Sequence, residues 1–369
     1  MQAKSPRKWH YDLLRTFHFL RHGWNKLTNH ALDLKDAFKE FHEEVWREAA
    51  DELSVDLEQF PGGYYRIRYG EQTTWIHDYQ VQFDDFVALD VARNKPLVSA
   101  LLIDHGIRVA PFLAFSLDEM EAARKFLNDR QSVCVVKPAL GCAGGKGVTM
   151  HVTTSRELTR AALFASAFST SIMIEEQIHG DVYRLLYLDG ELLDAIHRRP
   201  PHVTGDGRST IRELIRAENK QRAAESGKTA LKVLAIDVDC RTTLKRGGKS
   251  LKYVPAENET VAVKSTTNES AARDCDSIRN GIHDEIVREC AEATRVLGFR
   301  LVGVDLMTPD ASVPMAQSGG AIIEVNVSPG LHYHYQVRNV EERVPVAIPI
   351  LRKLLHMQAE KAPVGHPSQ

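Results

Sequence analysis

Apolar residues follow two different spacings along the chain, and these spacings predict an alternation of helices and strands. In residues 34–53 the apolar positions recur every three or four residues, which predicts an amphipathic helix. Further helices are predicted over residues 94–105, 117–127, 155–167, 210–218 and 285–297. Strands are predicted over residues 64–69, 107–115, 133–136, 148–152, 171–174, 182–188, 301–306 and 321–327, with Asp189-Gly190 as a hairpin turn. This succession is typical of an α/β or α+β fold.

Composition narrows the class of protein. The 369 residues carry 47 Lys and Arg against 49 Asp and Glu, so there is no basic excess for a large nucleic-acid surface. The N-terminus has no apolar stretch of signal-peptide length, and the apolar run at residues 97–103 is too short to cross a bilayer. Five cysteines without paired spacing indicate reduced thiols. We therefore expect a cytoplasmic protein that binds neither nucleic acid nor membranes.

The predicted strand at residues 133–136 leads directly into a lysine, Lys137, and then into a glycine-rich loop. That loop contains Gly141, Gly144, Gly145, Lys146 and Gly147. Glycines let the backbone turn its N–H groups toward an anion, and lysine neutralises phosphate oxygens, so the loop is a candidate phosphate site. It is not a Walker loop, because no Gly-Lys-Ser/Thr run opens a helix. A surface hairpin loop is the alternative interpretation.

A second motif follows the predicted strand at residues 171–174. There the chain reads Glu175-Glu176-Gln177-Ile178-His179-Gly180-Asp181, an apolar strand that ends in acids and a glycine. A hinge of this kind can hold adenine through backbone hydrogen bonds and ribose through an acid. A hairpin with solvated acids is the alternative.

Two predicted strands near the C-terminus carry oxygen ligands. Asp305 lies in one, and Glu324 and Asn326 lie in the other, on the same face because strand side chains alternate. Carboxylate and amide oxygens are ligands that Mg²⁺ takes alongside substrate phosphates. Two carboxylates held together without a cation are costly, which favours a magnesium site over a salt-bridged sheet.

The order of these motifs resembles that of the ATP-grasp carboxylate–amine ligases. The run Arg198–Gly207, followed by Thr210-Ile211-x-Glu213-Leu214-Ile215, is similar to the ATP-grasp module of the cyanophycin synthetases. So are Tyr183-Arg184-Leu185-Leu186, the Asn268 to His283 spacing, Asn326-x-Ser328-Pro329-Gly330-x-x-x-His334 and, upstream, Asn94-Lys95. The resemblance covers about residues 60–355.

The resemblance implies roles for individual residues. Lys95 and Lys137 match the lysines that hold the nucleotide phosphates, and Gly144, Gly145, Lys146 and Gly147 match the loop that closes over them. Glu175, Glu176, Ile178 and Asp181 fall at the adenine and ribose end. Asp305, Glu324 and Asn326 match the magnesium ligands. Arg184 and Arg198 are expected, with Lys146, to act in catalysis by steadying the substrate carboxylate or its phosphate. Ser328, Gly330 and His334 are expected in the substrate site.

The implied cofactors are ATP and Mg²⁺, and the implied reaction has two steps. A carboxylate attacks the γ-phosphate of ATP and gives an acyl phosphate and ADP. An amine then attacks the acyl carbon, and an amide or peptide bond forms. No enzyme nucleophile is required, so Cys142 is interpreted as a small loop residue.

Three departures from the family pattern bear on the substrate. The acid that the family has two residues after the hinge glycine is replaced here by Val182, with Asp181 as the nearest acid. A Ser-Thr-Gly-Gly stretch is replaced by Ser270-Ala271-Ala272-Arg273, and we hypothesise that Arg273 recognises an acidic acceptor. The Mur-ligase-like half that adds arginine is absent from this sequence, so we do not expect repeated Asp–Arg polymer synthesis by this chain alone.

The expected architecture is an ATP-grasp fold with two α+β lobes gripping ATP, preceded by an N-terminal α/β region. We place the N-terminal helical and pre-ATP-grasp region at residues 1–92, the small lobe at 93–172, the large lobe at 173–358 and a flexible tail at 359–369. Residues 1–60 are expected to form a helical recognition or dimer-contact domain.

The expected function is ligation of amino-acid or short-peptide substrates, in dipeptide or natural-product biosynthesis, by a homodimer. Two alternatives stay open. One is a phosphotransferase that stops after phosphoryl transfer, and the other is a nucleotide-binding regulator without catalysis.

Overall fold

The computed structural model describes residues 34–142, 144–225 and 229–357 of the chain. Its helices are α2 (Lys35–Glu52), α3 (Phe86–Ala92), α4 (Lys95–Asp104), α5 (Met120–Arg130), α6 (Ser155–Ser166), α7 (Ile211–Ala224), α8 (Val238–Arg246), α9 (Asp284–Leu297), α10 (Met315–Ser318), α11 (His332–Tyr335) and α12 (Ala347–Leu354). Within the described ranges, every helix falls short, in length or apolar character, of what crossing a bilayer requires.

The strands of the described residues form four antiparallel sheets. The central sheet has the order β13 (Cys275–Ser277), β10 (Glu191–Arg198), β9 (Asp181–Leu188), β14 (Leu301–Thr308) and β15 (Ala321–Val327). A second sheet joins β5 (Phe112–Phe115), β8 (Ile172–Glu176), β6 (Cys134–Pro138) and β7 (Thr149–Val152). The meander β1 (Asp56–Phe60), β2 (Tyr64–Tyr69), β3 (Gln72–His77) and β4 (Gln80–Val81) forms the third, and β11 (His202–Thr204) and β12 (Thr260–Ala262) form the fourth.

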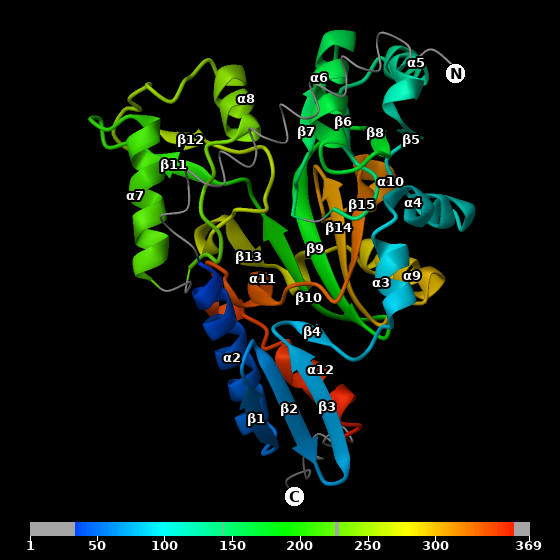
Figure 1. The fold of residues 1–369 in the computed structure, drawn as a ribbon, viewed down its shortest axis with the longest axis vertical. Coiled ribbons are helices and arrows are strands. Elements are labelled where there is room, and N and C mark those ends of the chain that lie inside the picture. The colour runs from blue at the N-terminus through cyan, green and yellow to red at the C-terminus, as the bar shows by residue number, and fades with distance from the viewer. Residues whose placement is uncertain (1–33, 143, 226–228, 358–369) are drawn as a thin grey trace, which may run out of the picture.

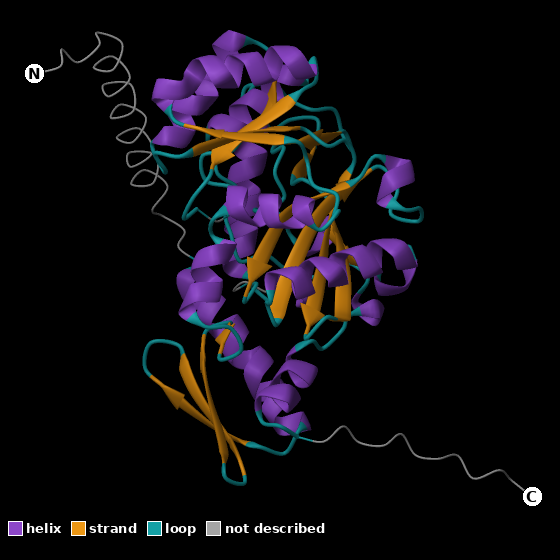
Figure 2. Ribbon diagram, turned by 90° about the vertical axis from the view of Figure 1, so that its right-hand side faces the viewer, coloured by secondary structure: helices purple, strands orange, loops and turns teal. Residues whose placement is uncertain are grey.

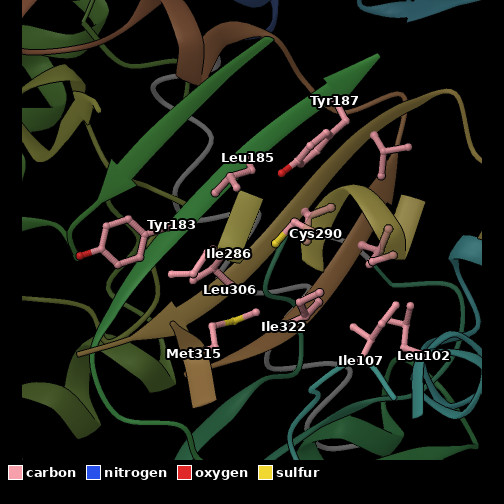
Figure 3. Close-up of a cluster of buried hydrophobic side chains, with 14 of the residues drawn as sticks. Leu102, Ile107, Tyr183, Leu185, Tyr187, Ile286, Cys290, Leu306, Met315 and Ile322 are labelled. Carbon is pink, nitrogen blue, oxygen red and sulfur yellow. The ribbon is translucent and has the colours of Figure 1, made fainter. Parts of the chain in front are cut away.

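The central sheet holds the main core of the molecule (Figure 1). The predicted hairpin between β9 and β10 is confirmed, since Asp189 and Gly190 both have positive φ, at 50° and 81°, as a tight hairpin turn demands. On one face, alternate residues of β9 and β14 pack against α4 and α9 (Figure 3). The Tyr187 hydroxyl there donates to the Val287 carbonyl at 2.8 Å, so the phenol is satisfied although buried.

The small lobe is the sheet β5-β8-β6-β7, covered by α5 and α6. Its predicted elements are confirmed, and Ser116 begins the helical segment with a capping box to Glu119. The predicted extended segment 107–115 is shorter than expected, because only its last residues pair as β5. Lys137 emerges from this lobe at the end of β6, which is buried along its whole length.

Residues 201–225 and 229–263, called here the 201–263 unit, form a further unit that the sequence pattern did not separate from the large lobe. Strands β11 and β12 pack with α7 and α8 around a core of their own (Figure 1). The helix predicted at residues 210–218 extends to Ala224, and Thr210 and Glu213 form its capping box. This unit faces the small lobe across the top of the central sheet in Figure 1.

The N-terminal region corrects one expectation. The helix predicted over residues 34–53 is confirmed as α2, but the expected helical domain does not continue to residue 60, because residues 56–60 form strand β1. Trp46 of α2 is fully buried among residues of β2, β3 and the C-terminal α12. In Figure 2 the β1–β4 meander lies at the lower end of the molecule, with helices beside it. The region therefore shares its core with the end of the chain. The parts of these predictions on residues 1–33 and 358–369 lie outside the described residues.

Candidate functional site

A cleft of about 970 Å³ lies where the small lobe, the central sheet and the 201–263 unit meet. A volume of this order accommodates a nucleotide with a small second substrate. Its lining includes the predicted residues Lys95, Gly144, Gly145, Lys146, Gly147, Arg184, Glu324, Asn326, Ser328 and Gly330. The structure thus brings together residues from the glycine loop, α4, β9, β15 and the Pro-Gly turn.

Two lysines converge on neighbouring residues of β15. Lys95 is the first residue of α4, which Asn94 caps, and its Nζ lies 2.5 Å from Oε1 of Glu324. Lys137 Nζ lies 3.3 Å from the carbonyl of Ile323 and 2.6 Å from Glu175. Burial alone would lower the pKa of Lys95, but Glu324 outweighs it and raises that pKa, so the ammonium stays charged. Lys95 lines the cleft, where phosphate oxygens can reach its ammonium. Lys137 does not line the cleft, because it is buried and paired with Glu175, and its contact with phosphate stays a prediction.

The glycine loop is closely packed at two of its positions. A Cβ on Gly145 would lie 2.3 Å from the side-chain amide nitrogen of Asn268, and a Cβ on Gly147 would lie 2.7 Å from Pro138 and 2.8 Å from Phe168. Both glycines also have positive φ, which L side chains rarely adopt. The loop is consequently seated against the strand end and against Asn268, which belongs to the opposite wall of the cleft.

Replacing Gly147 with alanine should lower kcat/KM for ATP by about 10²-fold, because the displaced loop can no longer close over the phosphates. Gly141→Ala is the matched control, since its φ is also positive, at 67°, but its Cβ would meet nothing within 4 Å. The measurement is ADP formation against ATP concentration. Equal losses in the two variants would show that backbone strain, and not the position of the loop, causes the effect.

The predicted magnesium ligands lie side by side on β14 and β15. Asp305 is paired with Glu324 in the strand register, and Asn326 Nδ2 donates to Asp305 Oδ2 at 3.3 Å. Arg184 holds the same carboxylate with two hydrogen bonds, of 2.7 and 2.6 Å. In the described ranges no group of three or more His, Cys, Asp and Glu gathers to hold a metal ion. Glu324 and Asn326 line the cleft, where Mg²⁺ would complete its shell with phosphate and water oxygens. Asp305 is buried against Arg184 and does not line the cleft, so its part in a magnesium site stays a prediction.

The hinge residues lie apart from this cleft. Glu175 is buried and paired with Lys137, while Glu176 lies 3.9 Å from Arg130. Asp181 is half-exposed and paired with His197 at 2.8 Å, so the geometry gives it a partner other than a ribose. Neither these three nor Ile178 line the cleft. Their adenine contacts stay a prediction.

The three predicted substrate arginines have different positions. Arg184 lines the cleft, whereas Arg198 is buried behind it, donating to the Thr267 carbonyl at 2.8 Å. The guanidinium of Arg198 lies 3.9 Å from the centre of the Tyr333 ring, so it acts on the cleft through that ring. Arg273 does not line the cleft and is instead paired with Glu218 at 2.8 Å. The hypothesis that Arg273 recognises the acceptor therefore has no structural support.

The turn after Asn326 forms one wall, but not with every residue expected there. Gly330 is required because the ring of His332 lies 2.9 Å from where its Cβ would be. His332 and Tyr333 line the cleft. His334 does not, because it is fully buried with Nδ1 2.8 Å from Asp194, and it acts as a support for the turn.

Several lining residues carried no signal that sequence reasoning used. They are Phe38, Tyr79, Lys232, Asp237, Asp239, Lys264 and Glu269. Asn268 also lines the cleft. In the sequence it was notable only for its spacing from His283, which assigned it no role. These residues come from α2, the turn between β3 and β4, and the 201–263 unit and the segment that follows it, and tertiary packing alone brings them to the cleft.

Known proteins resemble this chain in sequence and in fold. Cyanophycin synthetase from Synechocystis sp. is 30% identical over 308 residues, which are 80% of this chain and 33% of that protein. A bifunctional protein of glutathione biosynthesis from Listeria welshimeri is 28% identical over 296 residues, 79% of this chain and 38% of that protein. The chain therefore spans about a third of the length of these relatives. No protein-family model matches it.

A solved structure gives the fold. The bifunctional glutathione synthetase from Pasteurella multocida superimposes with a TM-score of 0.55 at 19% identity, over 86% of this chain and 44% of that one. The mixed helices and antiparallel sheets agree with that architecture. The chain is therefore a homologue of the ATP-grasp ligases and has their fold.

Proposed function

We propose that this chain is an ATP-dependent ligase that joins an amino-acid-like carboxylate to an amine and releases ADP and phosphate. The observation that supports it most directly is the convergence of Lys95 and Lys137 on neighbouring residues of β15, beside Asp305 and Asn326. Phosphoryl transfer from ATP requires cations close to oxygen ligands for a metal ion. The similarity to amide-bond ligases favours an amine as the final acceptor.

In the first step a carboxylate oxygen attacks the γ-phosphorus of ATP. A bond to phosphorus forms, the bond to the bridging oxygen of ADP breaks, and ADP leaves. Lys95, Lys137 and Lys146 neutralise the phosphate oxygens, and Arg184 orients Asp305. Glu324, Asp305 and Asn326 would hold Mg²⁺, which supplies further positive charge when bound.

In the second step the amine nitrogen attacks the acyl carbon. The C–N bond forms, the bond from carbon to the phosphate oxygen breaks, and nitrogen gives up a proton. Phosphate leaves with the electron pair. The glycine loop, seated on Pro138 and Phe168, excludes water that would otherwise hydrolyse the acyl phosphate. No thiol takes part.

The test measures phosphate release from ATP and Mg²⁺ with single amino acids and with all pairs, followed by mass spectrometry of each positive mixture. A ligase gives release that depends on a particular pair and a product whose mass is their sum less one water. ADP formation that needs only one substrate, with a phosphorylated product, would instead identify a phosphotransferase.

The proposal includes two further features taken from the family. One is a cytoplasmic location, which the five free cysteines support, since thiols stay reduced there. The other is a homodimer, taken from the resemblance alone. Dipeptide or natural-product biosynthesis is the proposed setting.

A further inference from the structure

Tyr333 of α11 lines the cleft, although only 6% of the residue is exposed. Its hydroxyl lies 3.4 Å from the Asn268 carbonyl, which is longer than a good hydrogen bond between two oxygen atoms. Buried phenols usually have a closer partner, as Tyr335 of the same helix has in the backbone N–H of Ala347, at 3.0 Å. The Tyr333 hydroxyl is therefore available to a group bound in the cleft.

Two arginines lie against the ring of Tyr333. The guanidinium of Arg198 is 3.9 Å from the ring centre, and that of Arg184 is 5.2 Å away. Asp305 pairs with Arg184, whereas the described part of the chain offers Arg198 no acid and leaves its Nε without a hydrogen-bond partner. The nearby Cys275 thiol stays neutral, because burial raises its pKa to about 11. An aromatic ring attracts cations, and a phenol that has lost its proton attracts them more strongly, so both arginines favour the ionised phenol.

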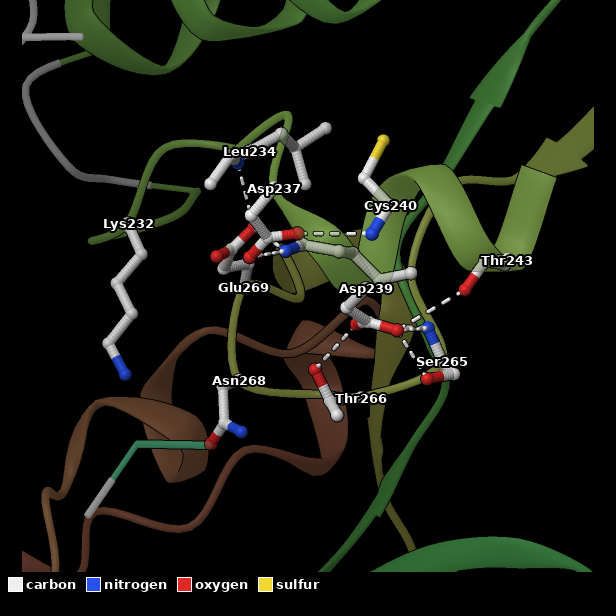
Figure 4. A network of polar contacts seen from close by, with 12 residues as sticks. Lys232, Leu234, Asp237, Asp239, Cys240, Thr243, Ser265, Thr266, Asn268 and Glu269 are labelled. Atoms are coloured by element: carbon white, nitrogen blue, oxygen red, sulfur yellow. Dashed lines mark hydrogen bonds and ion pairs between the residues drawn. The ribbon is translucent and has the colours of Figure 1, made fainter. Parts of the chain in front are cut away.

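The facing wall of the cleft contributes one more cation. Lys232 of the 201–263 unit lines the cleft, and in Figure 4 its side chain extends toward Asn268, the residue that the Tyr333 hydroxyl contacts. The acids of that wall are bound to Lys264 and to hydroxyl and backbone donors; they are Asp237, Asp239 and Glu269. This cluster is net negative, but its carboxylates are directed to their own donors, and Lys232 lies outside it.

The balance of these groups favours the ionised form of Tyr333. Burial raises the pKa of Tyr333, but Arg198, Lys232 and Arg184 lower it by more, so that pKa lies below the ordinary value for tyrosine. The adjacent His332 adds no charge, because burial lowers its pKa well below the ordinary value. Loss of the Tyr333 proton also gives up only the long contact with a carbonyl, so little hydrogen bonding opposes it.

Tyr333 lies between two parts of the cleft that the proposed reaction uses. The Asn268 side chain, on one side of it, is seated against the glycine loop, since a Cβ on Gly145 would lie 2.3 Å from its amide nitrogen. Arg184, on the other side, binds Asp305 on the central sheet. The acyl phosphate of the proposed reaction has to lie between the glycine loop and the sheet, and so within reach of this phenol.

We propose that Tyr333 is the base that takes a proton from the attacking amine in the second step. This inference rests on the proposed ligase function. The amine of an amino acid is mostly an ammonium at neutral pH, and an ammonium has no electron pair with which to attack the acyl carbon. The Tyr333 oxygen takes the first proton and passes it to water after the product leaves. The second proton, which nitrogen loses as the C–N bond forms, leaves with the phosphate.

The test compares two amines in the wild type and in Tyr333→Phe, which keeps the ring that packs against Arg198. With the amino-acid pair found in the phosphate-release screen, kcat/KM for the amine should fall by about 10²-fold in the variant, the lower range for loss of a general base. The loss should shrink as the pH rises and the amine loses its proton unaided. Hydroxylamine is uncharged at neutral pH and turns an acyl phosphate into a hydroxamate without such a base, so that rate should stay within about threefold of the wild type.

Tyr335→Phe is the matched control, because it removes the same hydroxyl from the same helix outside the cleft, and its rates with both amines should match the wild type. A second measurement does not depend on turnover. The phenolate absorbance that the wild type shows in excess of Tyr333→Phe should appear below about pH 10, the ordinary range for tyrosine.

Three results would overturn the role of Tyr333 and leave the ligase in place. They are an equal loss with the amino acid and with hydroxylamine, no loss with either, and a phenolate difference that appears only above about pH 10. Absence of hydroxamate in the wild type with every carboxylate would overturn the ligase as well.

Discussion

Glu324→Gln should lower the rate of carboxylate activation by about 10³-fold, the upper range for losing one charge that stabilises phosphoryl transfer. Glu324 is the carboxylate that contacts Lys95, lines the cleft and lies next to Asp305 in the strand register. Burial would raise the pKa of Glu324, but Lys95, Lys137 and Arg184 lower it, so the native group is charged. Glutamine keeps the size and a carbonyl for Lys95 but removes the charge that a magnesium ion needs.

Hydroxylamine traps an acyl phosphate as a hydroxamate. The measurement is the rate of hydroxamate formation from the carboxylate substrate at saturating ATP, with Glu341→Gln as the control. Glu341 is exposed on a short helical turn outside the cleft, and its variant should match the wild type. The loss should appear in kcat and not only in KM for ATP. A Glu324→Gln enzyme that retains a tenth or more of the wild-type rate would show that this carboxylate is not a metal ligand.

Arg184→Met should destabilise the folded protein by about 3–5 kcal/mol, because it leaves the Asp305 carboxylate buried without its partner. The two side chains form two hydrogen bonds across β9 and β14, and both are less than one tenth exposed. Asp305→Asn in the same protein should recover part of the loss, since a neutral amide tolerates burial better. Urea unfolding measures both variants.

Arg300→Met offers a matched control at the other end of the same two strands. Arg300 also binds an aspartate, Asp189, through two hydrogen bonds, but that pair is partly exposed, and Asp189 keeps a second cation in Lys353, 2.9 Å away. Its loss should cost about 0–1 kcal/mol, as for other surface pairs. Similar losses at Arg184 and Arg300 would mean that burial of the Asp305 pair contributes nothing to its energy.

The parts of the site that lie on regular strands could be predicted from the sequence. Lys137, Glu324 and Asn326 stand at the ends or on one face of short apolar runs, and the period of a strand fixes which side chains share a face. The resemblance to the ATP-grasp ligases then set their order. The same local logic predicted the hairpin at Asp189-Gly190, where φ is positive at both residues.

What the sequence could not predict depends on contacts between distant segments. Arg273 looked like a free cation in a motif that departs from the family, but α7 supplies Glu218 to pair with it. Lys232 carried no motif, and only the folding of the 201–263 unit brings it to the cleft. Similarly, β1 follows a helix in a charged stretch and forms because β2 offers it an edge. Packing, and not local pattern, decides these positions.

The most direct test of the ligase mechanism uses a carboxylate substrate labelled with ¹⁸O in both oxygens. Attack of that carboxylate on ATP, followed by attack of the amine, moves one labelled oxygen into the released phosphate for every amide bond formed. The proposed mechanism predicts one ¹⁸O atom in each phosphate, with ADP unlabelled. Unlabelled phosphate released alongside the amide, or label recovered in AMP, would contradict it.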